Sequence, residues 1–288
     1  MLSWLYWMIA FWFPWQGGCP RPIQSTSFLS LASIESTLQS TIGNDLHTRI
    51  HFWSQQFLDA PYAVDPLGEG VTPDTDPLID FCRFDCETYV ETVLALAFST
   101  TIRDVELWMN RMRYINGIRD IRYRYYTMAL HWIPGNEQLG YLESFLFSPF
   151  GRVSRFIYSH GKWAPEHKRH FILLGENAPH GKAEVHYNSL SQLLEKQNEI
   201  PVPSLAFLVG SPLPGNPFLI MHMGLVLQRA DGKRIFRHAS RSRGRMRVEE
   251  REFDMYLRSL YKHFHDPNIP RRPVLGLRLY RIREPQKK

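Results

Sequence analysis

The spacing of apolar residues in the first part of the chain predicts helices. Between Ser33 and Leu58, apolar side chains recur every three or four residues, as on one face of a helix. They are Ile34, Leu38, Ile42, Leu46, Ile50, Trp53 and Phe57. Gly43-Asn44 interrupts this run and divides it into two helices. Two further helices are predicted over Asp85–Ser99 and Ile102–Met112.

After Lys182 the pattern changes to short runs rich in β-branched and aromatic residues, which predict strands. These runs are Ala183–Tyr187, Leu205–Val209, Phe218–Leu227, Arg234–His238 and Leu275–Arg281. A helix is predicted over Phe253–Tyr261, whereas Asp59–Asp80 is a loop rich in Pro, Gly and Asp. Tyr114–Gly151 fits no single pattern. Helices first and strands later indicate an α+β fold, with N-terminal helices packed on a C-terminal antiparallel sheet or barrel.

The N-terminal segment Leu2–Trp15 is almost wholly apolar and ends at Gln16-Gly17-Gly18-Cys19-Pro20. It is too short to span a bilayer and has the length of a signal-peptide apolar region, so we expect residues 1–19 to be an export segment. Gly18-Cys19 could instead end a lipoprotein cleavage box, with Cys19 acylated. Because no Lys or Arg precedes the run and Trp is dense in it, a retained and packed segment is the alternative.

Composition and charge narrow the function classes only slightly. Of the 288 residues, 44% are hydrophobic and 22% charged, an ordinary globular balance. The net charge of +6 suits anionic lipids, acidic wall polymers or nucleic acid. No zinc-finger spacing, aromatic RNA-binding signature or basic helical arm accompanies it, so we expect no nucleic-acid partner.

Cys86 is the candidate nucleophile, because Asp85-Cys86 opens the strongest predicted helix. A thiol in the first helical turn lies near unpaired N–H groups and the positive end of the helix dipole, which predicts a lowered pKa. The alternative is a small buried core cysteine. The three cysteines give no disulfide framework, and we expect Cys82 to be a packing residue.

His222 is the candidate base and His238 the candidate orienting group. His222 lies on the face of a predicted strand that carries both polar and apolar residues, two residues before Gly224. A three-residue loop, Ala230-Asp231-Gly232, with Gly232 in the left-handed region, would place Gly224 opposite His238. The two imidazoles would then be diagonal neighbours on one face of the sheet. A core histidine or a zinc site including His222 and His238 is the alternative.

These residues resemble the NlpC-type cell-wall hydrolases, which are papain-like enzymes with a Cys, a His and a third polar residue. The segment Phe57–Tyr62 is similar to the entry motif of the family, and Asp85–Glu91 is similar to its nucleophile motif. The Thr-aromatic-Val-Glu sequence after Asp-Cys resembles the branch called N-acetylmuramoyl-L-alanine amidase-like, formerly a domain of unknown function. Arg113–Gly117, followed by Arg124, Trp132 and Asn136, suggests the same branch, and His222–Val226 with His238–Ser240 resembles its histidine strands.

The chain also departs from the family pattern. Met221 stands where relatives usually carry Ser before the catalytic His, and Pro203-Ser204 stands where a Gly-Asp pair often opens the preceding strand. Tyr125-Tyr126 occupies the place of a family His. These differences affect the substrate pocket more than the reaction.

The resemblance implies a papain-like domain over residues 48–288, preceded by a helical extension over 20–47. It implies hydrolysis of the amide between N-acetylmuramic acid and L-Ala by Cys86, His222 and His238, without a metal or another cofactor. Oxyanion and substrate contacts would come from Tyr62, Asp85, Arg124, Asn136, Ser240 and Arg241. Arg241, Arg243, Arg245 and Arg247 alternate after His238 and would share one strand face toward stem-peptide carboxylates; a solvated basic edge is the alternative.

Three other functions stay open at this point. A γ-D-glutamyl-diaminopimelate endopeptidase would use the same catalytic residues, a wall-binding module would use none, and a related lipid-directed acyltransferase would need an apolar channel. The resemblance implies peptidoglycan or muropeptides as the partner and the periplasmic cell envelope as the location. We expect a monomer that touches the membrane only through its N-terminal segment or a lipid on Cys19.

Overall fold

The computed structural model describes residues 31–66, 74, 76–158, 163–242, 244–264 and 273–286. The expected export segment at 1–19 lies outside the described residues, and so do Cys19, the site of the alternative lipidation, and the start of the predicted 20–47 extension. The longer helices are α1 (Leu31–Ser40), α2 (Leu46–Gln56), α3 (Cys86–Phe98), α4 (Ile102–Arg113), α5 (Ile133–Gln138), α6 (Pro165–Leu174), α7 (Leu190–Lys196) and α8 (Phe253–Phe264). A turn of π-helix, Met128–Trp132, leads into α5.

Within the described residues, eight strands form one antiparallel sheet. They are β1 (Leu142–Phe145), β2 (Gly151–Ile157), β3 (Gly181–Ser189), β4 (Ser204–Gly210), β5 (Ile220–Gln228), β6 (Arg234–Ser240), β7 (Arg247–Glu252) and β8 (Val274–Ile282). Their order is β2-β3-β8-β4-β5-β6-β7, and β1 pairs with β8 beside this path. β5 and β6 therefore lie at one end of the sheet, with β7 as its edge.

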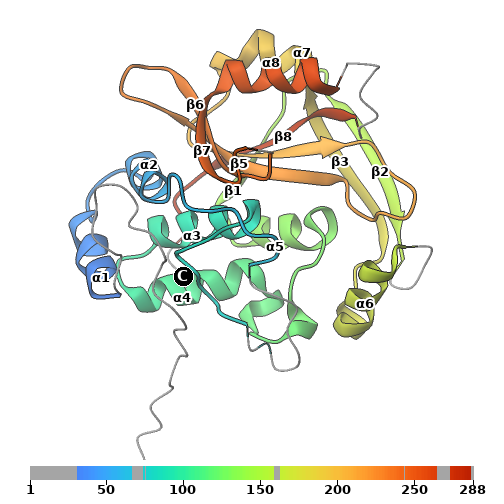
Figure 1. Cartoon of the computed structure of the whole chain (residues 1–288), viewed down its shortest axis with the longest axis horizontal. Helices are drawn as coiled ribbons and strands as arrows, with labels where there is room; N and C mark the ends of the chain where they lie inside the picture. The colour runs from blue at the N-terminus through green and yellow to red at the C-terminus, as the bar shows by residue number, and fades with distance from the viewer. Residues whose placement is uncertain are drawn as a thin grey trace, which may run out of the picture.

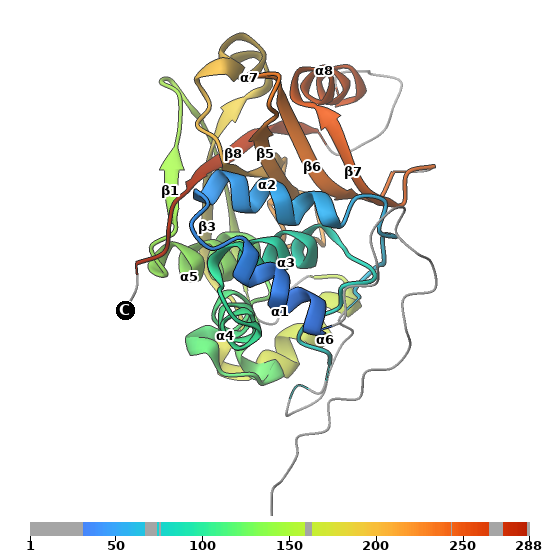
Figure 2. The same ribbon diagram turned by 90° about the vertical axis from the view of Figure 1, so that its left-hand side faces the viewer.

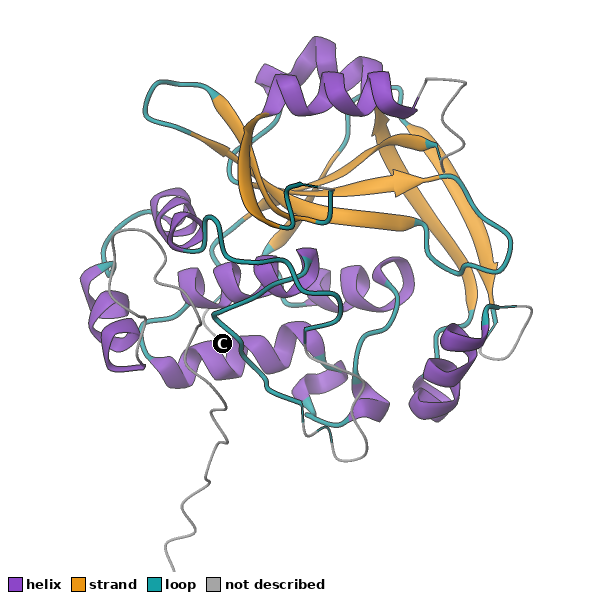
Figure 3. Cartoon of the chain, viewed as in Figure 1, coloured by secondary structure: helices purple, strands orange, loops and turns teal. Residues whose placement is uncertain are grey.

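Helices cover both faces of the sheet, and a hydrophobic core lies under each layer (Figure 1). The larger core joins α1–α5 to one face, with Trp53, Val93 and Phe207 fully buried in it. The smaller core joins α7 and α8 to the other face, around Phe236 and Leu257. Figure 3 shows the strands between these two helical layers. The predicted α+β class, with N-terminal helices packed on an antiparallel sheet, is thus observed.

Helix α3 is the element that brings the N-terminal half of the chain to the candidate base. It packs against α2 and α4 on its outer sides and against β5 and β6 on its inner side. Figure 2 shows α1 and α2 on the same side of the sheet as α3. Ten of its thirteen residues are buried, since its face toward the sheet and its faces toward α2 and α4 are all covered. Such a helix has little freedom to move its first residue, Cys86.

The observed elements differ from the prediction mainly where charge or irregular backbone obscured the pattern. β7 carries five charged residues in its six, Arg247-Val248-Glu249-Glu250-Arg251-Glu252. Its charged side chains pair with those of neighbouring strands, so no apolar alternation marks it. β1, β2 and the helices α5, α6 and α7 were also not predicted. The five predicted strands and the predicted helices around α1–α4 and α8 are present.

Candidate functional site

Cys86 is the first residue of α3, and Asp85 caps the helix. The Asp85 carboxylate accepts a hydrogen bond from the Thr88 backbone N–H at 2.8 Å, and the Thr88 hydroxyl accepts one from the Asp85 N–H at 3.0 Å. This reciprocal capping box fixes the start of the helix. The Cys86 side chain is partly exposed, and the backbone N–H of Met223 on β5 hydrogen-bonds to its sulfur. The nucleophile candidate therefore touches the strand that carries His222.

The environment of Cys86 corrects the expected acidity of its thiol. Burial, followed by the negative charge of Asp85, raises the pKa of Cys86, although the backbone N–H groups of Met223 and of Cys86 itself lower it. Burial also lowers the pKa of His222 well below its usual range. The prediction of a lowered thiol pKa is therefore wrong for this geometry, because the helix terminus does not outweigh desolvation. The thiol and imidazole are both neutral at pH 7.

The hairpin between β5 and β6 has the predicted register. Leu225 lies opposite Arg237 and Gln228 opposite Arg234, so that the same register places Gly224 opposite His238. Its three-residue loop closes through Gly232, whose φ of +80° is in the left-handed region. His222 Nε2 lies 2.7 Å from His238 Nδ1. The predicted contact between the two imidazoles is confirmed. Because it uses Nε2 of His222, the other ring nitrogen, Nδ1, takes no part in it.

Two residues that contact this histidine pair were not predicted. Glu249 on β7 lies directly opposite His238, and its Oε1 is 3.4 Å from His238 Nε2. Tyr256 on α8 packs against His238 with ring centroids 5.3 Å apart and stacks on Phe236 at 4.3 Å. No spacing signal pointed to Glu249, since β7 itself was not predicted. Tyr256 lies on the predicted helix Phe253–Tyr261, whose apolar face could have drawn attention to it.

Of the predicted oxyanion and substrate residues, Tyr62, Asp85 and Ser240 lie close to the candidate catalytic residues. Burial raises the pKa of Tyr62, and the charges of Cys86 and Asp85 raise it further, which places its hydroxyl in their field. The Ser240 side chain is buried and hydrogen-bonds to Glu249. The residues from the entry motif and from the third-residue strand thus converge around Cys86 and His238.

The predicted arginine row is wrong as a strand face. β6 ends at Ser240, so Arg241 and Arg245 lie in the exposed connection to β7, and Arg247 begins β7. Arg243 lies outside the described residues. The charge of Arg241 still reaches Tyr62 and lowers its pKa, against the larger effect of burial. Arg247 instead pairs with Asp59 at 2.9 Å.

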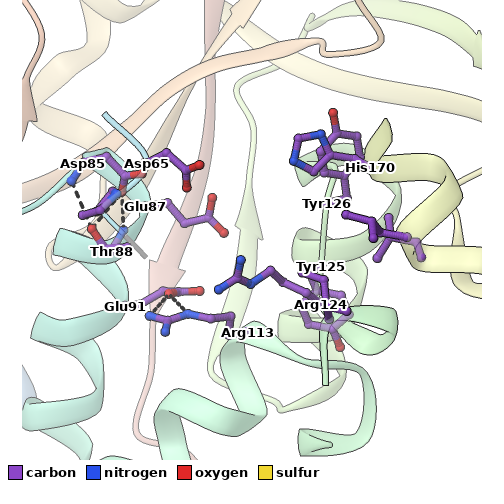
Figure 4. A pocket seen from close by; sticks show the side chains of 14 residues that line it. Asp65, Asp85, Glu87, Thr88, Glu91, Arg113, Arg124, Tyr125, Tyr126 and His170 are labelled. Atoms are coloured by element: carbon purple, nitrogen blue, oxygen red, sulfur yellow. Dashed lines mark hydrogen bonds and ion pairs between the residues drawn. The ribbon is translucent and has the colours of Figure 1, made fainter. Parts of the chain in front are cut away.

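A polar cavity of about 180 Å³ opens on the flank of α3, beside Cys86 but not lined by it. Its walls come from the start of α3, from the Ile121–Tyr126 segment and from α6 (Figure 4). The lining residues are Asp65, Pro66, Asp85, Glu87, Thr88, Glu91, Arg113, Ile121, Arg124, Tyr125, Tyr126, His170, Leu173 and Leu174. Cys86 faces β5, so the cavity and the thiol lie on adjoining sides of the same helix start.

Glu87 and Arg124 approach each other from opposite walls of this cavity (Figure 4). Burial raises the pKa of Glu87 well above its usual range, and the charges of Glu91 and Asp85 raise it further. A protonated Glu87 would present a hydrogen-bond donor to a ligand. Arg124, predicted as a substrate contact, does line the cavity, and it is held by Asp74 at 3.3 Å.

Asn136 has a structural position instead of the predicted site position. Its side chain is fully buried, and its amide nitrogen donates to the carbonyls of Met112 at 3.0 Å and Trp132 at 2.8 Å. Its amide oxygen accepts a hydrogen bond from the Tyr141 hydroxyl. Since every polar atom of the side chain is used inside the protein, Asn136 has none left for a ligand.

Other features of the described residues bear on the alternatives. Among the described residues, Cys86 is a free thiol. In the part of the chain that the structure describes, no three His, Cys, Asp or Glu side chains gather as metal ligands would. The same residues include no helix with the length and apolar character of a membrane span.

Comparison with known proteins gives a family for part of the chain and a fold for most of it. Residues 52–148 match the family AmiA-like, described as N-acetylmuramoyl-L-alanine amidase-like. A Legionella pneumophila protein of the family DUF1460 has a similar solved structure, with a TM-score of 0.72 and 20% identity over 87% of this chain and 93% of that one. A solved N-acetylmuramoyl-L-alanine amidase from Bacteroides uniformis gives a TM-score of 0.60 and 21% identity over 83% of this chain and 100% of that one. No curated protein matches the sequence. The chain therefore has the fold of these solved proteins, and its segment from 52 to 148 is similar to the AmiA-like amidase family.

Proposed function

We propose that the chain is a cysteine-nucleophile amidase that hydrolyses the bond between N-acetylmuramic acid and L-Ala in peptidoglycan fragments. The observation that carries the proposal is the pairing of His222 with His238 at 2.7 Å on the strand whose Met223 N–H contacts the Cys86 sulfur. Helix α3, which begins at Cys86, packs on the strand that carries His222. A nucleophile, a base and an orienting group within reach of one another form the arrangement that acyl transfer needs. The AmiA-like match and the amidase of similar fold support the choice of bond.

The first step of the proposed reaction begins from a neutral thiol, because burial raises the pKa of Cys86 and lowers that of His222. His222 Nδ1 takes the thiol proton as the sulfur attacks the lactyl carbonyl carbon. The carbonyl π electrons move onto oxygen. Backbone N–H groups at the start of α3 and the Tyr62 hydroxyl stabilise this oxyanion.

The second half of the reaction releases both products. His222 returns its proton to the nitrogen of L-Ala, the C–N bond breaks, and the muramoyl group stays on Cys86 as a thioester. Water, deprotonated by His222, then attacks the thioester carbonyl. The C–S bond breaks, the sulfur recovers a proton, and the free lactyl acid leaves. His238 keeps the His222 ring in position throughout.

The cavity beside α3 supplies the proposed substrate contacts. Asp85 and Glu87 offer it two carboxyl groups on one wall, and Arg124 offers a charge-paired guanidinium on the other. Arg241, in the exposed connection after β6, would meet stem-peptide carboxylates. The proposal also includes residues 48–288 as the catalytic domain, a monomeric state, a papain-like mechanism and a periplasmic location reached through the N-terminal segment.

Product analysis tests the function. The full chain and a Cys86→Ala variant are incubated with disaccharide-tetrapeptide muropeptides, and the products are identified by mass spectrometry. The proposal predicts free L-Ala-initiated tetrapeptide and a peptide-free disaccharide from the native chain alone. A disaccharide carrying L-Ala-D-Glu would establish the endopeptidase instead, and an unchanged substrate that still binds would indicate a wall-binding module.

A further inference from the structure

We infer that Glu249 is a positioning residue that sets the proton arrangement of the histidine pair, so that His222 presents a bare Nδ1 to the Cys86 thiol. The inference rests on the proposed function for its kinetic consequence. The proton arrangement itself follows from the contacts among β5, β6 and β7, and it can be measured without any turnover.

The three side chains form a row across three neighbouring strands. His222 Nε2 is 2.7 Å from His238 Nδ1, and His238 Nε2 is 3.4 Å from Glu249 Oε1. Glu249 lies directly opposite His238 in the ladder between β6 and β7, so that the two side chains share one face of the sheet. Only 6% of the His238 side chain and 11% of the Glu249 side chain are exposed. Water therefore has little access to either group.

The acceptor at the end of the row determines where each proton lies. An ionised carboxylate can only accept hydrogen bonds. His238 Nε2 is buried and makes no hydrogen bond of full geometry, and the nearest carboxylate oxygen, Glu249 Oε1, is 3.4 Å away. A proton on His238 Nε2 is stabilised by that carboxylate, and His238 Nδ1 is then an acceptor. His222 donates to that acceptor through Nε2–H, and a neutral imidazole with its proton on Nε2 has a lone pair on Nδ1. That lone pair is what a general base for the thiol requires.

Charges on the neighbouring elements make the carboxylate necessary. Burial lowers the pKa of His238, Glu249 opposes that shift, and Arg251 on β7 and Arg245 in the preceding connection lower the pKa further. Burial keeps Glu249 from being fully hydrated, but His238, Arg245 at 3.7 Å and the Ser240 hydroxyl together hold its pKa below the usual range. Tyr256 on α8 and Cys86 on α3 are neutral at pH 7, because burial raises the pKa of each. Glu249 is thus the negative charge that faces the pair.

The test compares Glu249→Gln with Glu249→Ala and the native chain. The imidazole ¹⁵N chemical shifts of His222 and His238 report which ring nitrogen carries the proton. We expect Nε2–H on both rings in the native chain. We expect a mixture of tautomers or an Nδ1–H form in both variants, since a carboxamide can donate to His238 Nε2 and alanine offers no partner. Glu252→Gln, at the exposed end of β7, is the matched control and should leave the ¹⁵N shifts unchanged.

Amidase kinetics provide the second readout. We expect kcat to fall at least about 100-fold in Glu249→Gln with KM nearly unchanged, because a wrong tautomer in a comparable triad costs on the order of 10⁴. The limb of the pH profile that belongs to the imidazole should move to lower pH, since the carboxylate that stabilises the imidazolium is gone.

Two outcomes would overturn the inference: native-like ¹⁵N shifts in both Glu249 variants, or Nδ1–H on His222 in the native chain. If the native chain lacks amidase activity, the proposed function fails, while the ¹⁵N shifts still decide the role of Glu249. A native tautomer with reduced activity in both variants would assign Glu249 a structural role and so contradict the inference.

Discussion

Replacing Glu91 by Leu should destabilise the protein strongly, because Glu91 is the buried partner of Arg113 below the cavity. The Glu91 side chain is fully buried, and one of its oxygens accepts hydrogen bonds from Arg113 Nε at 3.0 Å and Nη2 at 2.8 Å. Its other oxygen accepts from Trp132 Nε1 at 2.9 Å. Figure 4 shows this pair at the floor of the cavity, one helical turn below Glu87.

The magnitude follows from the charge that the substitution leaves behind. Arg113 is only 4% exposed and cannot lose its proton, so its guanidinium would stay buried with the Leu78 carbonyl as its remaining partner. Breaking a buried ion pair in this way costs about 3–5 kcal/mol. For a chain of this size each kcal/mol corresponds to roughly 2–4 °C, so Tm should fall by about 6–20 °C.

Thermal unfolding followed by far-UV circular dichroism, with urea unfolding alongside, measures the loss. The matched control is the double variant Glu91→Leu with Arg113→Met, which removes both charges and should recover most of the stability. A loss below about 1 kcal/mol in the single variant would refute the reasoning. So would a double variant no more stable than the single one.

Two further predictions concern the hairpin and the response to acid. In Gly224→Ala, the new Cβ would lie 2.5 Å from Phe236 Cζ and 2.8 Å from the Arg237 carbonyl oxygen, so the two strands that carry His222 and His238 must separate. The substitution should lower the free energy of unfolding by about 1–3 kcal/mol and kcat/KM roughly 100-fold. Gly232→Ala, at the open hairpin loop, should cost stability alone, and equal activity losses in both variants would contradict this account. Burial lowers the pKa of His131 from 6.5 to about 4, so the unfolded chain takes up a proton there that the folded chain refuses. The free energy of unfolding is therefore unaffected by His131 above pH 6.5 and falls, by up to about 3 kcal/mol, as the pH is lowered to about 4. The urea concentration at half-unfolding, measured against pH, should fall less on acidification in His131→Gln than in the native chain.

The sequence predicted those parts of the site that depend on local patterns. Asp85 before an apolar helical run identified the start of α3, and Gly232 in a three-residue loop fixed the register that joins His222 to His238. Both features are encoded within a few neighbouring residues, so no knowledge of the tertiary structure was needed.

The parts that depend on tertiary environment could not be predicted from the pattern. The acidity of Cys86 depends on burial against β5, which outweighs the helix terminus. An arginine in a predicted strand suggests a side chain that faces solvent. Arg237 in β6 is instead only 2% exposed, and Glu250 and Ser54 accept its hydrogen bonds. Asn136 matched a family position yet is saturated inside the core. Glu249 was missed because its strand shows charge where apolar alternation would be expected.

The central claim is that the Cys86 sulfur attacks the substrate carbonyl. The most direct test is intact-protein and peptide mass spectrometry of the full chain, quenched with acid at early times during turnover of a disaccharide-tetrapeptide. The account predicts a mass increase equal to the muramoyl acyl group, carried on the peptide that contains Cys86 and absent in Cys86→Ala, which should not turn over. Turnover by Cys86→Ala, or an acyl group on any other residue, would contradict it.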